Sequence, residues 1–175
     1  LDLGDEAARL LFQRGAQALD EIRTAERIGD RRQVGLVLHH LLLGDTLMLT
    51  PLLAKLRATY PAAEIGLCCP RAFLPLYAAQ PFGVIALPFD PREVSTLADL
   101  ARRGPWDHCL IPAENRYTLL ARALGARCIT GFGGDRPDWK NRLLDQVASF
   151  PAAPACFGDF AASALVPGAP PRHFS

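Results

Sequence analysis

The fold is decided by the stretch Val34-Gly35-Leu36-Val37-Leu38-His39, which Gly44-Asp45 follows after a short apolar link. A short apolar run of this kind is typical of a buried β-strand, so we expect a strand over 34–39. Residues 46–60 then carry apolar side chains at helical spacing, which places Gly44-Asp45 in the first turn from strand to helix. In open parallel sheets, ligands bind beyond the carboxyl ends of the strands. The stretch therefore predicts an α/β sheet with the Asp45 carboxylate at its binding edge.

The same alternation of apolar runs and amphipathic segments continues along the chain. Further strands are expected over 64–69, 84–87, 108–111 and 127–130. Helices are expected over 46–60, 71–80, 91–103 and 116–125, because apolar residues recur there at i, i+3 and i+4. Strands and helices that alternate in this way form βαβ units with right-handed crossovers. We therefore predict a Rossmann-like doubly wound, mostly parallel sheet.

The pattern divides the chain into three parts. Residues 1–30 form an amino-terminal helical extension, whose helix over 4–27 has mixed charges that favour packing on the domain over membrane or partner binding. Residues 31–150 form the Rossmann-like domain, and 151–175 form a return segment toward a further, carboxy-terminal element. Two more helices are expected over 138–147 and 158–165. The chain begins at Leu1 without a methionine and ends in a proline-rich tail, so we expect a piece of a longer protein.

Composition excludes several classes of function. Nineteen basic and 18 acidic side chains give a net charge of +1, which argues against a highly charged disordered chain and provides no overall field for nucleic acid. No apolar run approaches the roughly 18 residues that cross a bilayer, and the first residues do not form a signal peptide. The five cysteines lack the spacing of metal ligands, so we expect buried, reduced thiols, a cytoplasmic location, and neither metal nor cofactor.

Several motifs occur in an order that is known from one family. The first group is His39-His40-Leu41-Leu42-Leu43-Gly44-Asp45-Thr46, Thr50-Pro51-Leu52-Leu53-Ala54-Lys55-Leu56-Arg57 and Tyr60-Pro61-Ala62-Ala63-Glu64-Ile65. The second is Trp106-Asp107-His108-Cys109-Leu110-Ile111, then Leu119-Leu120-Ala121-Arg122-Ala123-Leu124-Gly125-Ala126-Arg127, ending in Gly131-Phe132. In this combination the chain, over about residues 34–132, resembles the amino-terminal domain of the bacterial heptosyltransferases of glycosyltransferase family 9.

The resemblance implies one half of a two-domain glycosyltransferase of the GT-B type. The amino-terminal half of such an enzyme faces a lipid-linked oligosaccharide acceptor, usually the lipopolysaccharide inner core, and the carboxy-terminal half holds the ADP-heptose donor. The family's catalytic carboxylate falls on Asp45, which would take the proton from an acceptor hydroxyl during an inverting transfer. The resemblance thus implies a cytoplasmic enzyme that contacts the inner membrane surface through its acceptor. Since only one half is present, we expect the isolated chain to be inactive.

Asp45 also has a purely structural interpretation. An aspartate at this place can cap the helix that follows, because its side chain accepts a backbone N–H at the positive helix end. Pro51 bears on this alternative, since a proline costs nothing at the first position of a helix that Thr50 caps. A helix beginning at Pro51 would leave Asp45 in the turn. The two roles are compatible.

The other candidate acceptor-binding residues are His39, His40, Gly44, Thr46, Arg71, Arg116 and Arg136. Each has a structural alternative. One of the two histidines could titrate near neutral pH and bind an anion, or could be a hydrogen-bonded structural residue. Arg136 lies in the glycine-rich run 131–136, which is either a phosphate-binding turn or a flexible turn with an exposed arginine. Arg71 is either an acceptor-phosphate contact or a solvated residue at a helix start. Lys55, Arg57, Arg102 and Arg103 are expected on solvated helix faces.

The chain departs from the family's pattern in ways that leave the acceptor open. His39 stands where members commonly have arginine, Leu41 and Leu42 stand where they have small hydroxyl residues, and Arg116 is only approximately in place. Two other classes of function remain. One is a noncatalytic Rossmann-like binding or docking module, with the leucines near Asp45 and helix 4–27 as its interface. The other, a stand-alone nucleotide-binding domain, is weakened because no glycine-rich phosphate loop is present.

Overall fold

The centre of the structure is a six-stranded, wholly parallel sheet with the strand order β3-β2-β1-β4-β5-β6. This computed structural model describes residues 34–150 and 156–167, all of which belong to one compact unit. The strands are β1 (Val34–Val37), β2 (Glu64–Cys69), β3 (Val84–Pro88), β4 (His108–Ile111), β5 (Cys128–Phe132) and β6 (Gln146–Ala148). The Rossmann-like, doubly wound prediction is confirmed.

The strand order places a topological switch point between β1 and β4. The chain runs outward from β1 to β2 and β3, then returns to the other side of β1 for β4 and continues to β5 and β6. Val37 of β1 pairs with Leu67 of β2 on one side and with Leu110 of β4 on the other. Connections therefore leave the sheet in opposite directions at the carboxyl ends of β1 and β4, which is where open α/β sheets bind ligands.

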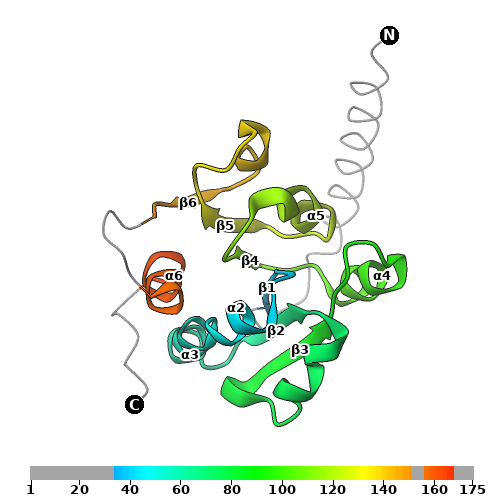
Figure 1. Cartoon of the computed structure of the whole chain (residues 1–175). Helices are drawn as coiled ribbons and strands as arrows, with labels where there is room; N and C mark the ends of the chain where they lie inside the picture. The colour runs from blue at the N-terminus through cyan, green and yellow to red at the C-terminus, as the bar shows by residue number, and fades with distance from the viewer. Residues whose placement is uncertain (1–33, 151–155, 168–175) are drawn as a thin grey trace. The chain divides into compact units, whose positions relative to one another are not determined.

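Helices cover both faces of the sheet (Figure 1). They are α2 (Leu43–Leu47), α3 (Thr50–Thr59), α4 (Val94–Arg103), α5 (Thr118–Ala123) and α6 (Phe157–Leu165). Shorter 3-10 segments are η1 (Arg71–Tyr77), η2 (Pro81–Gly83), η3 (Asn115–Tyr117) and η4 (Asp138–Asn141). Helices α3 and α6 lie on one face and α4 and α5 on the other, so the core forms two layers.

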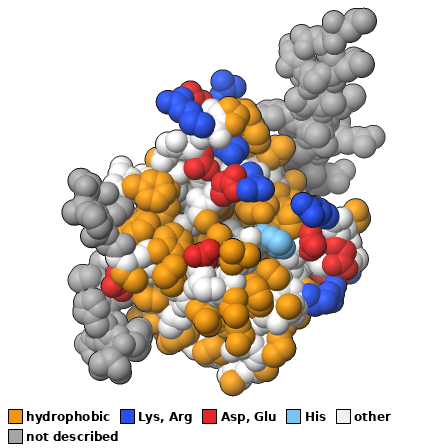
Figure 2. All heavy atoms as spheres, in the orientation of Figure 1, with side chains coloured by type: hydrophobic (Ala, Val, Ile, Leu, Met, Phe, Trp, Pro, Cys, Tyr) orange, Lys and Arg blue, Asp and Glu red, His pale blue; other side chains and the backbone are white. Residues whose placement is uncertain are grey.

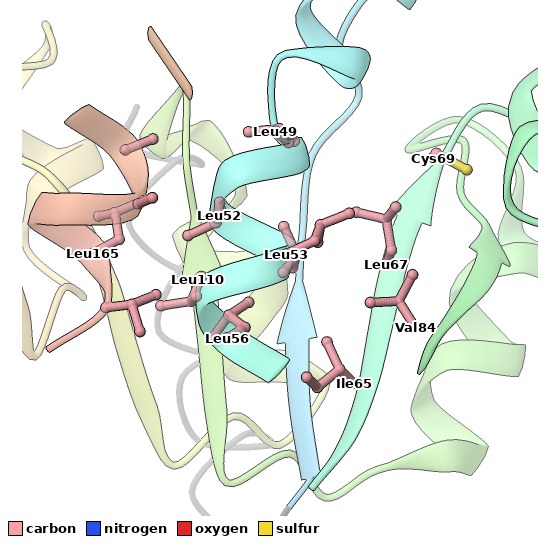
Figure 3. Packing of buried hydrophobic residues seen from close by; sticks show 14 of the residues in the cluster. Leu49, Leu52, Leu53, Leu56, Ile65, Leu67, Cys69, Val84, Leu110 and Leu165 are labelled. Carbon is pink, nitrogen blue, oxygen red and sulfur yellow. The ribbon is translucent and has the colours of Figure 1, made fainter. Parts of the chain in front are cut away.

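The first core layer comes from a leucine stripe on α3. Leu49, Leu52, Leu53 and Leu56 recur at i, i+3, i+4 and i+7 and are almost wholly buried. Figure 3 shows them between the strands and α6, whose Leu165 belongs to the same cluster. Fully burying a leucine side chain contributes about 1.5–3 kcal/mol, so this stripe fixes α3 on the sheet. The second layer lies under α4 and α5 and includes the buried Trp106.

Most predicted elements are confirmed, with three differences. The single helix expected over 46–60 is two helices, because the chain turns at Met48 and Leu49 before Pro51 enters the first turn of α3. The helix expected over 71–80 is the 3-10 segment η1, which contains Pro75, and an interior proline removes a helical hydrogen bond. The helix expected over 138–147 is wrong, since this segment forms η4 and then the edge strand β6.

The remaining expectations have mixed outcomes. The helix over 158–165 is confirmed as α6, whereas the expected helix 4–27 lies outside the described residues. Cys68, Cys69 and Cys109 are free and buried as predicted, and burial raises the pKa of each thiol, but Cys156 is exposed. None of the helices in the described part is both long and apolar enough to cross a membrane.

Candidate functional site

Asp45 lies on α2, directly after the segment that leaves the carboxyl end of β1. It is the third residue of this short helix and is half-buried. Leu42 is the N-cap of α2 and Leu49 is the N-cap of α3, and neither helix has a side-chain cap. The helix-cap interpretation of Asp45 is therefore wrong. Within 34–150 and 156–167, no residue hydrogen-bonds or ion-pairs with this carboxylate. Asp45 is thus available to a ligand.

Its neighbours on α2 have different environments. The Thr46 hydroxyl is buried and donates to the carbonyl oxygen of Leu42 at 2.9 Å, which stabilises the first turn of the helix. The hydroxyl therefore faces the protein backbone rather than the sheet edge. Gly44 is exposed, and a Cβ atom built there would meet nothing within 4 Å. Space for a ligand beside the backbone of α2 therefore exists at Gly44.

His39 and His40 diverge at the end of β1. His39 is 1% exposed, its Nδ1 accepts the backbone N–H of Leu41 at 3.3 Å, and burial lowers its pKa to about 3. It is therefore neutral at physiological pH and supplies no cation, which favours its structural interpretation. His40 is exposed and packs edge-on against Phe89, with ring centroids 6.0 Å apart. Of the two, His40 is the one that solvent and ligands reach.

A small recess opens at the switch point, between the segments that follow β1 and β4. Its lining comprises Leu38, His39, His40, Leu41, Ala113, Glu114, Arg116 and Tyr117. The predicted residues His39, His40 and Arg116 thus meet in one place, next to the segment that leads into α2. The recess has one acidic and one basic side chain, and the walls are otherwise apolar, aromatic or neutral.

Glu114 neutralises the basic side chains at this recess. Its Oε2 accepts from Arg116 Nε at 2.6 Å, and its Oε1 accepts from Lys140 Nζ at 3.1 Å. The hydrogen bond from Arg116 lowers the pKa of the Glu114 carboxyl. Arg116 also lies over the Tyr117 ring, with Cζ 5.8 Å from the ring centroid. Arg116 is therefore near its expected place, but it is already paired.

Asn115 was missed by the sequence interpretation and organises the loops around the recess. It is fully buried, and its Nδ2 donates to Asn141 Oδ1 at 2.8 Å and to the carbonyl oxygen of Phe132 at the end of β5. Its backbone N–H donates to Asp135 Oδ2 at 2.7 Å. These contacts join the loops after β4 and β5. An asparagine four residues after the end of a buried strand was the available signal, because a buried amide requires partners.

The other predicted arginines lie outside the recess. Arg71 ion-pairs with Glu93 at 3.1 Å, and Arg136 ion-pairs with Asp138 at 2.5 Å; both arginines are exposed. The structure therefore places His39, His40 and Arg116 in the recess lining, and the segment after Leu41 leads into α2, which carries Gly44, Asp45 and Thr46. It does not group Arg71 or Arg136 with them. The described residues also contain no cluster of three or more histidine, cysteine or acidic side chains that could hold a metal ion.

Two basic side chains that were expected to be solvated have structural roles. Lys55 is 6% exposed. Arg57 donates to the carbonyl oxygens of Pro61, Ala63, Phe82 and Gly83 at 2.8–2.9 Å. Both expectations are wrong, because the side chains turn back toward neighbouring backbone. Arg102 and Arg103 are exposed on α4, as expected.

Known structures with a similar fold are glycosyltransferases. The described fold resembles glycosyltransferase family 9 from Veillonella parvula, with a TM-score of 0.63 and 18% identity over 79% of this chain and 42% of that one. It resembles E. coli heptosyltransferase WaaC with ADP, with a TM-score of 0.59 and 12% identity over 76% of this chain and 48% of that one. It also resembles E. coli ADP-heptose lps heptosyltransferase II, with a TM-score of 0.53 and 23% identity over 68% of this chain and 35% of that one.

The chain thus spans less than half the length of each of these three structures. No family model and no curated protein matches the sequence. At these identities the likeness concerns the fold, which agrees with the family that the sequence motifs indicated. The chain therefore has the heptosyltransferase-like fold of glycosyltransferase family 9.

Proposed function

We propose that this chain is the acceptor-side domain of an inverting glycosyltransferase and that Asp45 is its general base. The observation that carries the proposal is the Asp45 carboxylate on α2, which has no partner among the described residues and follows the sheet edge at the β1 and β4 switch point. This is where open α/β sheets bind ligands. The heptosyltransferase-like fold supports the class of reaction.

The reaction requires a proton acceptor next to the acceptor sugar. Asp45 would take the proton of an acceptor hydroxyl while that oxygen attacks the anomeric carbon of the donor from the face opposite the leaving nucleotide. The bond from the anomeric carbon to the diphosphate oxygen then breaks, ADP leaves with the electron pair, and the configuration inverts. General-base catalysis of this kind contributes about 10²–10⁴-fold in rate.

The donor and the acceptor are parts of the same proposal. An ADP-sugar, with ADP-heptose as the first candidate, would be held by a second domain, and a lipid-linked oligosaccharide would lie at the edge that carries Asp45 and the recess. The 175-residue chain alone would then bind an acceptor without transferring sugar to it. A cytoplasmic enzyme that meets its acceptor at the inner membrane surface fits this arrangement.

The test compares Asp45→Asn with Asp45→Ala in the protein at its native length. ADP release from ADP-heptose is measured with and without a lipid-linked core acceptor, and folding is checked by thermal unfolding. We expect both variants to lose about 10²–10⁴-fold in acceptor-dependent ADP release, because neither amide nor methyl accepts the proton. Asp99→Asn, an exposed acid on α4, is the matched control and should retain activity. Near-wild-type release by Asp45→Asn would reject the catalytic assignment.

A docking module is the second candidate function. Exposed apolar side chains on α2 favour it, since Leu42, Leu43, Leu47 and Met48 are 40–78% exposed. A native-length protein that releases no ADP with any sugar acceptor, while it folds normally, would support docking instead.

A further inference from the structure

The short helix α2 presents an apolar surface beside the candidate base. Leu42 is 78% exposed, Leu43 46%, Leu47 48% and Met48 40%, and we call these four residues the α2 rim. Hydrophobic side chains scattered singly on a surface are ordinary, but four on one five-residue helix and its two flanking residues form a patch. Figure 2 shows this edge of the sheet, where hydrophobic side chains gather over α2 and over the segment between β2 and β3.

The spacing of these residues places Asp45 within the rim. Asp45 lies three residues after Leu42 and three residues before Met48, which flank α2 at its two ends. Leu43 and Leu47 are an i and i+4 pair, so they are neighbours on one side of the helix. A molecule that brings a hydroxyl group to Asp45 therefore contacts apolar surface on both sides of that carboxylate.

The charges around the recess do not suit an anionic molecule. Arg116 of the recess lining donates to Glu114, and Lys140, which lies outside the lining, donates to the same carboxylate. The buried His39 remains neutral at physiological pH. Arg71 and Arg136, which were the other candidates for a phosphate contact, pair with Glu93 and Asp138 away from the recess lining. Arginine binds phosphate through the paired N–H groups of its guanidinium, which must be available to the anion. In the recess the guanidinium of Arg116 is already paired with the Glu114 carboxylate.

We propose that the acceptor of this domain is an uncharged glycoside whose apolar aglycone lies on the α2 rim while its sugar enters the recess. The aromatic and apolar side chains of His40, Leu41 and Tyr117 line the recess and suit a sugar ring. The inference rests on the proposed function, because it names the acceptor class of the same site. It excludes acceptors that are recognised through phosphate or carboxylate groups.

The test is equilibrium binding to the native-length protein without any donor, by isothermal titration calorimetry. The probes are octyl β-glucoside, octyl β-glucuronide and methyl β-glucoside below their critical micelle concentrations. They differ in one feature at a time, since the glucuronide adds a carboxylate and the methyl glucoside lacks the chain. We expect octyl glucoside to bind at least about tenfold more tightly than either of the others, because chain burial is favourable and an unpaired carboxylate is costly to desolvate.

Two variants connect the preference to the named residues. Leu43→Ser with Leu47→Ser should weaken octyl glucoside binding about tenfold, because the chain loses apolar contact area. Val94→Ser, which changes a still more exposed apolar residue at the start of α4, is the control and should leave this binding unchanged. Glu114→Gln should shift the preference toward octyl glucuronide, because it releases Arg116 and Lys140 from their acid.

Each result decides the inference. Tighter binding of the glucuronide by the wild type, or equal binding of octyl and methyl glucosides, would overturn it. Binding to phosphatidylcholine vesicles that the serine variants abolish, without discrimination among the soluble glycosides, would overturn it in favour of a membrane-binding surface. No donor or turnover is involved, so the titration measures acceptor binding alone. A failure of transfer therefore remains distinguishable from a failure of acceptor recognition.

Discussion

Lys55 Nζ donates a hydrogen bond to the backbone carbonyl oxygen of Val166 at 2.6 Å, and this contact joins the middle of α3 to the residue that ends α6. The two residues are 111 positions apart, and both are buried. Burial lowers the pKa of Lys55. The helix that carries the leucine stripe is therefore tied to the carboxy-terminal helix by a charged group in a mostly apolar layer.

Lys55→Met should destabilise the fold by about 1–3 kcal/mol, because the Val166 carbonyl group would lose a charged donor. Methionine keeps most of the length of the lysine stem, so the loss of packing is small. The measurement is urea denaturation of the wild type and the variant. Arg103→Met, on the exposed side of α4, is the control and should change stability by less than about 0.5 kcal/mol. Equal stability of Lys55→Met and wild type would show that the hydrogen bond contributes nothing.

His39 makes the stability depend on pH in the acid range. Its pKa falls from 6.5 to about 3 on folding, so the unfolded chain binds an extra proton between these values. The associated stability is fully present above pH 6.5 and is lost as the pH falls toward 3, at up to about 1.4 kcal/mol per pH unit. His39→Leu should remove this part of the slope.

The measurement is the free energy of unfolding of His39→Leu, of His40→Leu and of the wild type between pH 7 and pH 4. His40 also lowers the pKa of His39, so the His40→Leu curve shows how much of the slope depends on the neighbouring histidine. Parallel curves for His39→Leu and wild type would mean that His39 gains its proton equally easily in the folded protein.

Gly44→Ala separates a folding role of this glycine from a ligand-binding role. The site is exposed, a Cβ atom would meet nothing within 4 Å, and the residue lies inside α2. Alanine should therefore leave stability unchanged or raise it by up to about 1 kcal/mol, as expected for glycine replacement in a helix. If the acceptor approaches the backbone beside Asp45, the same change should lower acceptor binding several-fold. Unchanged binding would remove Gly44 from the site.

The sequence predicted the sheet well because buried parallel strands have a simple signature. Residues in β2 and β4 contact neighbours on both faces, so the two strands are short, nearly uninterrupted apolar runs, and their predicted bounds are those observed. The edge strand β6 was missed. Its Val147 is exposed, and Leu143 and Leu144 upstream lie at a spacing that also suits a helix. This segment is a strand because it pairs with β5, and the intrinsic preferences of its residues do not predict that pairing.

Three of the predicted site residues line one recess, whereas the ion pairs of its charged side chains were not predicted. The carboxyl ends of parallel strands lie at the same edge of a sheet. His39, His40 and Arg116 follow two adjacent strands, so they could be expected close together. Which acid each basic side chain binds depends on loop conformation. Lys140 reaches Glu114 across 26 positions, and Arg57 reaches the η2 carbonyl groups across 25 or more. No periodicity in the sequence encodes such contacts, because they form only after the sheet has aligned the loops.

Gly158 is the place where the carboxy-terminal helix constrains the region of Asp45. A Cβ atom at this position in α6 would collide with the backbone carbonyl oxygen of Met48 and would lie 3.1 Å from two ring atoms of Pro51. Intrinsic helix propensity favours alanine over glycine by about 1 kcal/mol, so an isolated helix would gain stability from Gly158→Ala. Here the collision involves backbone, which cannot rotate away as a side chain can.

We therefore expect Gly158→Ala to destabilise the protein by about 1–3 kcal/mol, against the sign of its helix propensity. Ser163→Ala, on the exposed side of α6, should be neutral or slightly stabilising by the same measure of thermal or urea unfolding. Because Met48 ends α2, the shift that relieves the collision must move α6 or the junction of α2 and α3. Loss of stability with unchanged octyl glucoside binding would place the shift in α6. Loss of both would show that α6 holds the α2 rim and Asp45 in position.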